Sequence, residues 1–419
     1  MKLAFVPPRF GPGVLGGSEA LVREAAYGFA ARGHDVEVVT TCALDHYSWA
    51  NELPAGPSEE NGLLVRRFPV VRHPSRAALS AQLSIHAGRV PDLDHQVSWL
   101  GFQFGAPGVF EHILRFGEKY DAIIFSPYMF WTTSVCVPFV AERAVVVPCL
   151  HDEAYARLEI LRPVLSDPAL AWFLSGPEHL LAHRLGPVTR RHSVTGGGVP
   201  VPSAYDPQGF MERHRLERPF VLYAGRREEG KNTDWMLESF AAAGRDGGLD
   251  LDLVLLGKGQ APGRAGGRGS GRAEGRAGGL RGGLAGTGGP LGEATTGRGR
   301  VIDLGFVSDH ERDSAFAAAT AYIQPSRMES FSRTVMEAWL AGTPVIAFDQ
   351  SEVVAWHCRR SGGGVTFSDR AGLAECLRLI ASRPELGSEM AAAGRRYVIE
   401  NYTWPTVLDR MEASLRAAL

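Results

Sequence analysis

The chain has 419 residues, of which 45% are hydrophobic, so it is long enough and apolar enough to build two buried cores. Its formal net charge of -2 argues against a surface that binds nucleic acid or an anionic membrane over its whole extent. The five cysteines are scattered and form no C-x-x-C pair, which favours reduced thiols in a cytoplasmic protein.

The first predicted elements form one βαβ unit. Residues 2–6 are apolar and predict a buried strand, a glycine-rich loop follows, and residues 18–32 have the periodicity of an amphipathic helix. Residues 36–40 predict the second strand. A proline pair comes directly after the first strand, too early for the apolar segment of a signal peptide.

The glycine-rich loop satisfies the G-x-G-x-x-G pattern of dinucleotide-binding folds with Gly11, Gly13 and Gly16. Such folds place an acidic residue at the end of the second strand, where it binds the ribose. This chain has Thr40 and Thr41 there. A dinucleotide-dependent oxidoreductase is therefore an alternative function, but the chain lacks the acid that such an enzyme uses to bind the ribose.

The rest of the first half continues the alternation of strands and helices. Residues 122–141 carry no charge, but serines, threonines and prolines interrupt them, so we expect a buried strand and an interior helix rather than a membrane span. Further strands are predicted at 145–148 and 172–175, with a helix at 177–185. A glycine turn at 196–202 marks the end of the first domain. The preceding region 45–119 is expected to shape a pocket.

His151 follows the strand predicted at 145–148, so its side chain projects from the carboxyl end of a strand, where α/β folds bind ligands. A buried structural histidine is the ordinary alternative. Asp152 is a candidate to orient the imidazole.

Patterns typical of metal ligands are weak. D-x-D occurs at 92–94 and 250–252, and we interpret both as solvated acids. His179 and His183 lie four residues apart on a predicted helix, but no third ligand is apparent, so they are interpreted as part of a surface face. We expect no metal site.

A second series of alternating elements follows. Strands are predicted at 220–225, 251–256, 301–304, 321–325, 345–348 and 364–367, and helices at 233–243, 309–319 and 334–341. Two such series predict two doubly wound parallel sheets, and the cleft between two domains of this kind is the expected site.

Residues 261–300 interrupt the second series. They are dominated by Gly, Ala and Arg and contain no aromatic residue, which predicts a disordered insertion between two strands. Arginine and glycine also occur in RNA-binding segments, but these usually carry aromatic residues as well. No nucleic-acid partner is expected.

Two cations and two acids carry the chemistry of the second half. Arg226 and Lys231 follow the strand at 220–225, and fixed cations in such a loop neutralise the charge of a departing diphosphate. Glu329 and Glu337 flank the start of a helix and can accept hydrogen bonds from sugar hydroxyls. The backbone amides of Ser330, Phe331 and Ser332, at the start of that helix, favour a phosphate there.

Several of these segments together resemble the retaining glycosyltransferases of family 4. Glu329-Ser-Phe-Ser332 and Glu337 resemble the E-x7-E signature, and Ala341-Gly-Thr-Pro-Val345 closes it. Gly225-Arg226 with Lys231 is similar to the G-R-x4-K phosphate clamp of the family. Gly16-Gly17-x-Glu19 matches as well, whereas Phe29 stands where the family pattern has Leu.

The resemblance implies a GT-B architecture of two Rossmann-like domains facing each other across a cleft. Residues 1–202 would bind the acceptor and residues 203–400 the nucleotide-sugar donor, while residues 401–419 would form a helix that crosses back to the first domain. The implied reaction moves a sugar from a nucleoside diphosphate sugar to an acceptor hydroxyl with retention at the anomeric carbon. It requires no metal and no other cofactor.

The resemblance also implies the roles of individual residues. The backbone of Gly16 and Gly17 would approach the diphosphate, Arg226 and Lys231 would clamp it, and Gly257 would lie at the nucleotide. Glu337 would hold the ribose, Glu329 the donor sugar, the amides of Ser330 to Ser332 the phosphate, and His151 with Asp152 the acceptor side.

Two further functions are compatible with the same fold. One is a protein that binds a sugar nucleotide or a glycan without catalysis, and the other is a sugar-nucleotide epimerase. For a lipid-linked acceptor, a transferase would also make peripheral contact with the inner face of a membrane.

Overall fold

The computed structural model describes residues 1–419 except 73–74, 103, 228, 248, 259–291 and 297–298. The chain divides into two compact units. The first unit comprises Met1–Pro200, Met328–Arg333 and Ile399–Leu419, and the second comprises Val201–Arg327 and Thr334–Val398. The predicted domain boundary after residue 202 falls close to the end of the first stretch.

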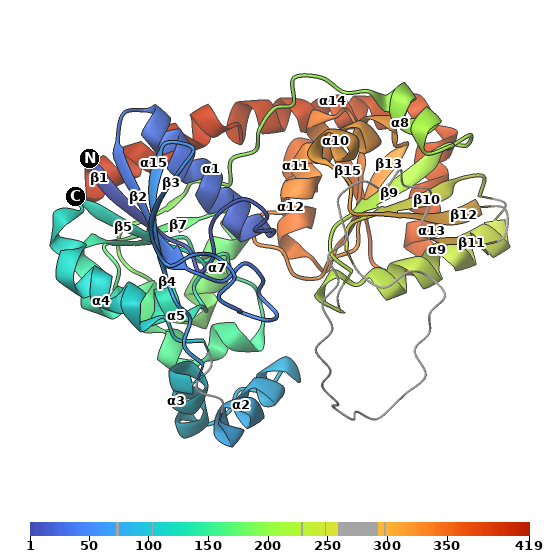
Figure 1. Ribbon diagram of the computed structural model, residues 1–419. Helices are drawn as coiled ribbons and strands as arrows, with labels where there is room; N and C mark the ends of the chain where they lie inside the picture. The colour runs from blue at the N-terminus through green and yellow to red at the C-terminus, as the bar shows by residue number, and fades with distance from the viewer. Residues whose placement is uncertain (73–74, 103, 228, 248, 259–291, 297–298) are drawn as a thin grey trace. The chain divides into compact units, whose positions relative to one another are not determined.

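The first unit is built on an eight-stranded sheet in the order β3-β4-β2-β1-β5-β6-β7-β8 (Figure 1). Its strands are β1 Lys2–Val6, β2 Asp35–Thr41, β3 Gly56–Glu60, β4 Leu63–Phe68, β5 Ala122–Phe125, β6 Ala144–Val146, β7 Leu170–Phe173 and β8 His192–Val194. Neighbouring strands are parallel except the pair β3 and β4. The strand order reverses between β1 and β5. In folds of this type, ligands bind at the carboxyl ends of the two strands at such a reversal.

The helices of the first unit are α1 Gly17–Ala31, α2 Arg76–His86, α3 Leu93–Phe102, α4 Pro107–Phe116, α5 Trp131–Ser134, α6 Pro163–Ser166, α7 Gly176–Leu185 and α15 Trp404–Ala418. The interior helix predicted within 122–141 is only the single turn α5, because Pro127 and Pro138 bound the segment and remove backbone donors. Among the described residues, none of the helices has the length and apolar character that crossing a membrane requires.

The last helix, α15, packs within the first unit. A Cβ built on Gly28 of α1 would lie 2.5 Å from Leu408 of α15, so the two helices approach closely at this glycine. The indole N–H of Trp172 on β7 donates to the Ser414 hydroxyl at 2.7 Å. The C-terminal segment is therefore part of the first unit, although the second unit separates it in sequence.

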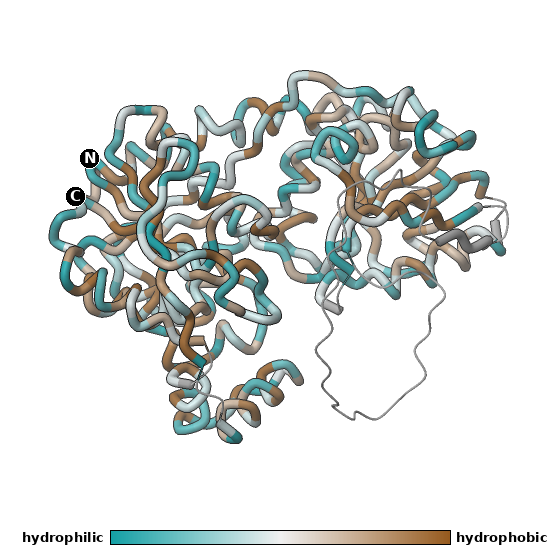
Figure 2. The backbone as a smooth tube through the Cα atoms, in the orientation of Figure 1, coloured by the Kyte–Doolittle hydropathy of each residue, from teal (hydrophilic) through white to brown (hydrophobic). Residues whose placement is uncertain are grey.

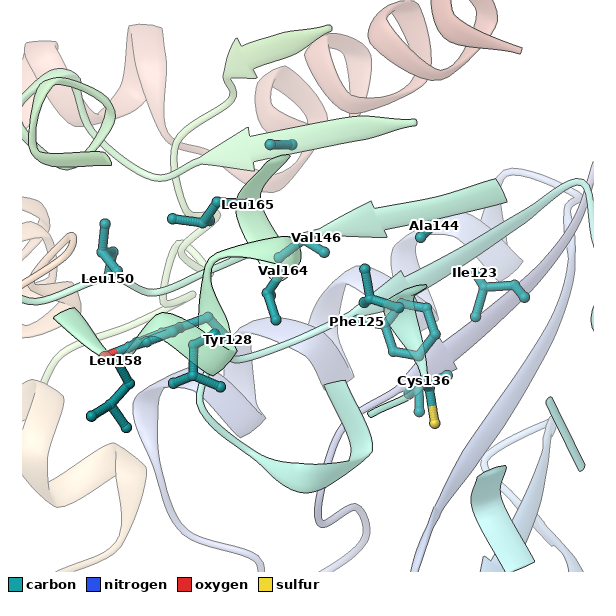
Figure 3. Close-up of a cluster of buried hydrophobic side chains, with 14 of the residues drawn as sticks. Ile123, Phe125, Tyr128, Cys136, Ala144, Val146, Leu150, Leu158, Val164 and Leu165 are labelled. Carbon is teal, nitrogen blue, oxygen red and sulfur yellow. The ribbon is translucent and has the colours of Figure 1, made fainter. Parts of the chain in front are cut away.

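The core of the first unit lies under the central strands. Ile123 and Phe125 of β5 and Val146 of β6 are fully buried among Leu158 and Val164 of the following segment (Figure 3). Parallel strands covered on both faces read as continuous apolar runs, which is why these strands could be predicted. Figure 2 shows the same apolar character along the strands of each sheet.

The second unit is built on a seven-stranded sheet in the order β11-β12-β10-β9-β13-β14-β15. Its strands are β9 Phe220–Ala224, β10 Asp252–Leu256, β11 Gly292–Thr296, β12 Gly299–Gly305, β13 Ala321–Gln324, β14 Val345–Phe348 and β15 Gly364–Phe367. Its helices are α8 Pro207–Arg213, α9 Thr233–Gly247, α10 Asp309–Ala318, α11 Arg333–Leu340, α12 Glu352–Ser361, α13 Arg370–Ser382 and α14 Pro384–Asn401. The first residue of α11 and the last three of α14 group with the first unit. The order reverses between β9 and β13, as it does between β1 and β5.

The predicted insertion at 261–300 is wrong at its C-terminal end. Residues 259–291 and 297–298 lie outside the described residues, but Gly292–Thr296 is a strand that pairs antiparallel with β12. Its backbone groups find partners on β12, and this pairing depends on tertiary structure rather than on the composition of the segment.

The interpretation of both D-x-D patterns as solvated acids is wrong for Asp252. Its side chain is only 1% exposed and pairs with the Arg300 guanidinium at 2.7 Å. Asp252 is the first residue of β10, where the sheet buries it, and the ion pair compensates its charge. Asp250 is exposed and pairs with Arg218.

Three glycines lie at the carboxyl ends of β9, β10 and β12. Gly257 has a φ of 117°, and a Cβ built there would lie 2.1 Å from the carbonyl oxygen of Gly225. Its N–H donates to the Gly305 carbonyl at 2.7 Å. Only glycine allows the backbone of these strand ends to approach so closely.

We expect Gly257→Ala to destabilise the protein by about 1–3 kcal/mol, because alanine adds both a disfavoured φ and a backbone overlap. Thermal unfolding of the two chains measures the change. Gly387→Ala in α14 of the same unit is the matched control, since a Cβ there meets its neighbours at ordinary contact distances. Equal midpoints for both variants would contradict the packing described above.

Candidate functional site

Two loops meet in the second unit where its strand order reverses. The carbonyl oxygen of Gly230, in the loop after β9, accepts hydrogen bonds from the Arg327 N–H and the Ser326 hydroxyl, each at 3.4 Å. Ser326 and Arg327 belong to the loop after β13. Lys231 follows Gly230 directly, so this predicted cation lies at the junction of the two loops. The junction occupies the position at which doubly wound sheets bind ligands.

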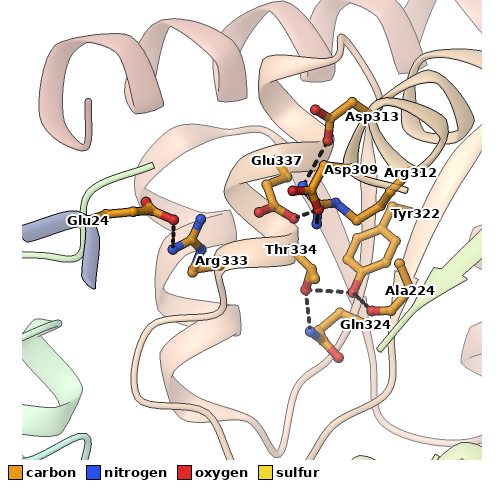
Figure 4. Close-up of polar contacts among 10 residues, drawn as sticks. All are labelled: Glu24, Ala224, Asp309, Arg312, Asp313, Tyr322, Gln324, Arg333, Thr334 and Glu337. Atoms are coloured by element: carbon orange, nitrogen blue, oxygen red, sulfur yellow. Dashed lines mark hydrogen bonds and ion pairs between the residues drawn. The ribbon is translucent and has the colours of Figure 1, made fainter. Parts of the chain in front are cut away.

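A buried polar cluster fixes the start of α11 against the sheet. The Tyr322 hydroxyl of β13 lies 2.8 Å from the Thr334 hydroxyl and 3.4 Å from the Ala224 carbonyl oxygen (Figure 4). The side-chain amide of Gln324 donates to the Thr334 hydroxyl at 3.3 Å. Because Thr334 is the second residue of α11, these contacts tie the beginning of the helix to β9 and β13.

The structure separates the two neighbouring arginines of the loop after β9. The side chain of Arg227 is almost fully buried, forms an ion pair with Asp303 at 2.5 Å and donates to the Gly257 carbonyl at 2.8 Å. It therefore binds three strand ends together. Arg226 is exposed, and its contact with a ligand stays a prediction. The sequence alone does not show which of the two neighbouring arginines is buried.

Glu337 lies on α11 and faces α10. Its carboxylate is 10% exposed, and one oxygen lies 3.6 Å from Nε of Arg312 (Figure 4). Arg312 also pairs with Asp309 and Asp313. The predicted contact of Glu337 with a ribose stays a prediction, and the structure adds a second role as a partner of Arg312.

The loop Met328–Arg333 groups with the first unit, whereas Glu337 and both predicted cations belong to the second. The Phe331 ring lies 5.1 Å from the Tyr402 ring, and a Cβ built on Gly197 would lie 2.8 Å from Phe331. Phe331 is thus an apolar anchor. The placing of Glu329 and Arg226 at one ligand stays a prediction.

Ser332 has a φ of 67°, a left-handed conformation that costs a serine about 1–3 kcal/mol. It directly precedes α11, which begins at Arg333. The amides of Ser330 to Ser332 therefore come before the first helical residue, and phosphate binding by them stays a prediction. Arg333, the first residue of α11, pairs with Glu24 at 2.9 Å (Figure 4). Glu24 also accepts a hydrogen bond from the Trp404 indole N–H at 2.7 Å.

Gly16 and Gly17 lie at the N-terminus of α1, as predicted. The Glu19 carboxylate of the first turn folds back over Gly16, where a Cβ would overlap its oxygen. Glu19 is 5% exposed and is neutralised by the buried guanidinium of Arg9. An acid in the first turn is stabilised by the helix dipole, and Arg9 removes the repulsion that it would exert on an anionic ligand.

The end of β2 carries two threonines where a dinucleotide-binding fold would place an acid. The hydroxyls of Thr40 and Thr41 donate to the carbonyl oxygens of Pro7 and Pro8 at 2.9 Å and 2.6 Å. Both threonines are buried. These hydrogen bonds hold the backbone just before the glycine-rich loop, so the two threonines have a structural role.

His151 lies in the loop after β6, with a side chain 33% exposed. The acid beside it is Glu153, whose Oε1 lies 3.8 Å from Nδ1 of the imidazole. Asp152 forms an exposed ion pair with Arg157. The orienting role of Asp152 thus stays a prediction, and sequence reasoning missed Glu153, two residues after His151.

Glu153 has an unusual environment. Burial raises the pKa of its carboxyl from 4.5 to about 7, and the hydrogen bond that the Tyr128 hydroxyl donates at 3.2 Å partly opposes this rise. A carboxyl that titrates near neutrality beside a half-buried imidazole is suited to exchanging a proton with a ligand.

Glu178 positions the His151 loop from the interior. It is fully buried on α7, and its two oxygens accept hydrogen bonds from the backbone N–H groups of Leu150, at 2.6 Å, and of Leu174. The residue before His151 is thereby tied to the end of β7. No pattern in the sequence distinguishes this glutamate from a surface residue.

Comparison with protein families matches residues 218–382 to the model described as "Glycosyl transferases group 1". This range contains the loops after β9 and β13, with Arg226, Lys231, Glu329 and Glu337.

Two relatives illustrate the extent of sequence similarity. A 92-residue stretch is 37% identical to D-inositol 3-phosphate glycosyltransferase of Streptomyces scabiei and covers 22% of this chain. The match spans about a fifth of the length of that relative. GDP-mannose-dependent alpha-mannosyltransferase of Mycolicibacterium smegmatis is 26% identical over 100% of this chain and 98% of its own length.

Two solved structures share the fold over the whole chain. Sucrose-phosphate synthase from Thermosynechococcus elongatus superposes with a TM-score of 0.70 at 16% identity, covering 100% of this chain and 99% of the other. HepE of Anabaena, in complex with UDP and glucose, superposes with a TM-score of 0.66 at 14% identity and covers 100% of both chains. At such identities the similarity is one of fold.

The environment of Glu153 predicts a pH dependence of stability. Between pH 4.5 and pH 7 the unfolded chain has lost this proton and the folded chain retains it, so stability falls as the pH rises. The loss is at most about 3 kcal/mol, and Glu153→Gln should abolish it. The unfolding midpoints of the wild type and of Glu153→Gln should therefore be similar at pH 5. At pH 8 the variant should have the higher midpoint. A constant difference across this range would show that Glu153 is not responsible.

Proposed function

We propose that the chain is a retaining, metal-independent glycosyltransferase, because residues 218–382 match the model described as "Glycosyl transferases group 1" and the chain has the GT-B fold. It transfers a sugar from a nucleoside diphosphate sugar to an acceptor hydroxyl. The observation that carries the proposal is the junction at the Gly230 carbonyl, where the loop of Arg226 and Lys231 meets the loop after β13.

Arg226 and Lys231 act on the leaving group. Negative charge grows on the diphosphate as the bond to the sugar breaks, and fixed cations stabilise that charge more in the transition state than in the ground state. Arg226 is exposed, whereas burial commits Arg227 to Asp303. Two side-chain cations perform the electrostatic task that a divalent metal performs elsewhere, and this is the basis for proposing metal independence.

The remaining donor contacts follow from the neighbouring loops. Glu337 accepts from the ribose hydroxyls, Glu329 from the donor sugar, and the amides of Ser330 to Ser332 and of Gly16 and Gly17 bind the diphosphate. Gly257 lets the nucleotide approach the end of β10. Phe306, at the end of β12, is 62% exposed and offers a flat face to the base.

His151 serves the acceptor side. Glu153 holds a proton near neutrality beside it, and Glu178 fixes the loop that carries it. Together they orient the acceptor hydroxyl toward the anomeric carbon. Asp152 remains a second acceptor-side candidate.

The reaction is tested with a panel of UDP, GDP, ADP and TDP sugars, because HepE binds UDP and the mycobacterial relative is named for GDP-mannose. Donor binding is followed by thermal shift, and turnover by release of the nucleoside diphosphate. NMR of the product establishes the anomeric configuration, and turnover that persists in EDTA establishes metal independence. Binding without turnover across the panel and an acceptor library would indicate a binding protein instead.

We expect Arg226→Ala and Lys231→Ala each to lower kcat/KM by about 100-fold, as loss of one electrostatic stabiliser does in other enzymes. Steady-state kinetics with the accepted donor measures the effect. Arg245→Ala removes an exposed arginine at the end of α9 in the same unit and should retain wild-type kinetics. Near-native turnover by both clamp variants would remove the proposed role of the cations.

Glu337→Gln separates a donor-binding role from a structural one. Loss of a charge-assisted hydrogen bond to the ribose should raise KM for the donor about tenfold or more. The control is Asp309→Asn, which weakens another acidic partner of Arg312 at a side chain that is 87% exposed. If Glu337→Gln lowers only the unfolding midpoint and leaves KM unchanged, its function is to hold Arg312.

A further inference from the structure

Three histidines of the first unit come together outside the proposed donor and acceptor sites. His179 and His183 lie on α7, and His192 is the first residue of β8. One ring nitrogen of each lies within 4.8 Å of the corresponding atom of the other two. We propose that this cluster, named the histidine triad, binds a divalent transition metal of the zinc type.

The spacing of the first two ligands suits a metal. The Nε2 atoms of His179 and His183 are 3.0 Å apart, one helical turn from each other. Two nitrogens bound to tetrahedral zinc at its usual bond length are separated by about 3.3 Å. The two atoms therefore need to move apart by only a few tenths of an ångström for both to bind one metal ion. Each ring would then carry its proton on Nδ1.

One ring nitrogen of the third histidine is held by the backbone. Nδ1 of His192 lies 3.0 Å from the Thr189 carbonyl oxygen. A carbonyl only accepts hydrogen bonds, so Nδ1 carries the proton and the lone pair is on Nε2. A hydrogen bond from the second ring nitrogen to a backbone carbonyl is the arrangement that orients metal-binding histidines.

An apolar side chain supports the histidine triad from inside. Phe173 of β7 is fully buried, and its ring centroid lies 5.2 Å from that of His179 and 6.3 Å from that of His192. His183 and His192 are exposed, so an ion can enter from solvent.

The chemistry of the ligands selects the metal. Three neutral imidazoles suit zinc, nickel, copper and cobalt, whereas magnesium and calcium prefer oxygen ligands. The remaining coordination position would hold water. Because β8 is the edge strand of the eight-stranded sheet, a metal held by both α7 and β8 would fasten this edge to the helix before it.

The test uses the full chain without a histidine tag. Titration against a chromophoric zinc chelator should give one tight site per chain, and cobalt should produce the visible absorption of tetrahedral Co²⁺. Removal of an outer partner of a metal ligand lowers affinity by about 10- to 100-fold, so loss of a ligand in His192→Ala should lower it at least as much. Magnesium should not compete.

His95→Ala is the matched control, since this exposed histidine on α3 has Asp92 as its partner and lies outside the histidine triad. It should bind zinc like the wild type. Equal unfolding midpoints of all metal-free chains would exclude misfolding as the cause of lost binding. Zinc affinity that is unchanged in both His192→Ala and His179→Ala, or an absent cobalt spectrum in the wild type, would overturn the proposal.

Discussion

The reversal of strand order is the constraint on which the rest of this structure depends. Parallel strands send all their following loops to one edge, and where the order reverses, two of these loops diverge to opposite faces of the sheet and leave room for a ligand. In the second unit the Gly230 carbonyl joins the loops after β9 and β13. Lys231, the start of α11 and the end of β10 at Gly257 thus lie at the carboxyl ends of the strands of this sheet.

Burial divides the charged residues of this edge into two groups with different tasks. Arg227 with Asp303 is almost removed from water, and truncating either partner would leave an uncompensated buried charge. This pair maintains the framework. Arg226 remains exposed, and it is the arginine that is proposed to bind the diphosphate. The same division holds in the first unit, where Arg9 and Glu19 form a buried pair beside the glycines that are proposed to meet the ligand.

The first unit positions its reactive groups by buried acids. Glu178 binds two backbone N–H groups, so the loop that carries His151 is held by α7 rather than by its own short sequence. Helix α7 also carries two members of the histidine triad on its exposed side. One ten-residue helix therefore supports the loop of the proposed acceptor site on its buried face and a second proposed site on its outer face.

The sequence by itself determined the two series of strands and helices, because buried parallel strands are continuous apolar runs and glycines mark their ends. The strands at 122–125, 345–348 and 364–367 were located correctly. It also supplied Arg226, Lys231 and the E-x7-E segment as candidates through their resemblance to family motifs. Only the tertiary structure decided that Arg227 and Asp252 are buried, that Glu153 lies beside His151, and that His192 completes a triad with α7. Burial and proximity between elements depend on how strands pair and helices cover them, and a local pattern of residues does not contain that information.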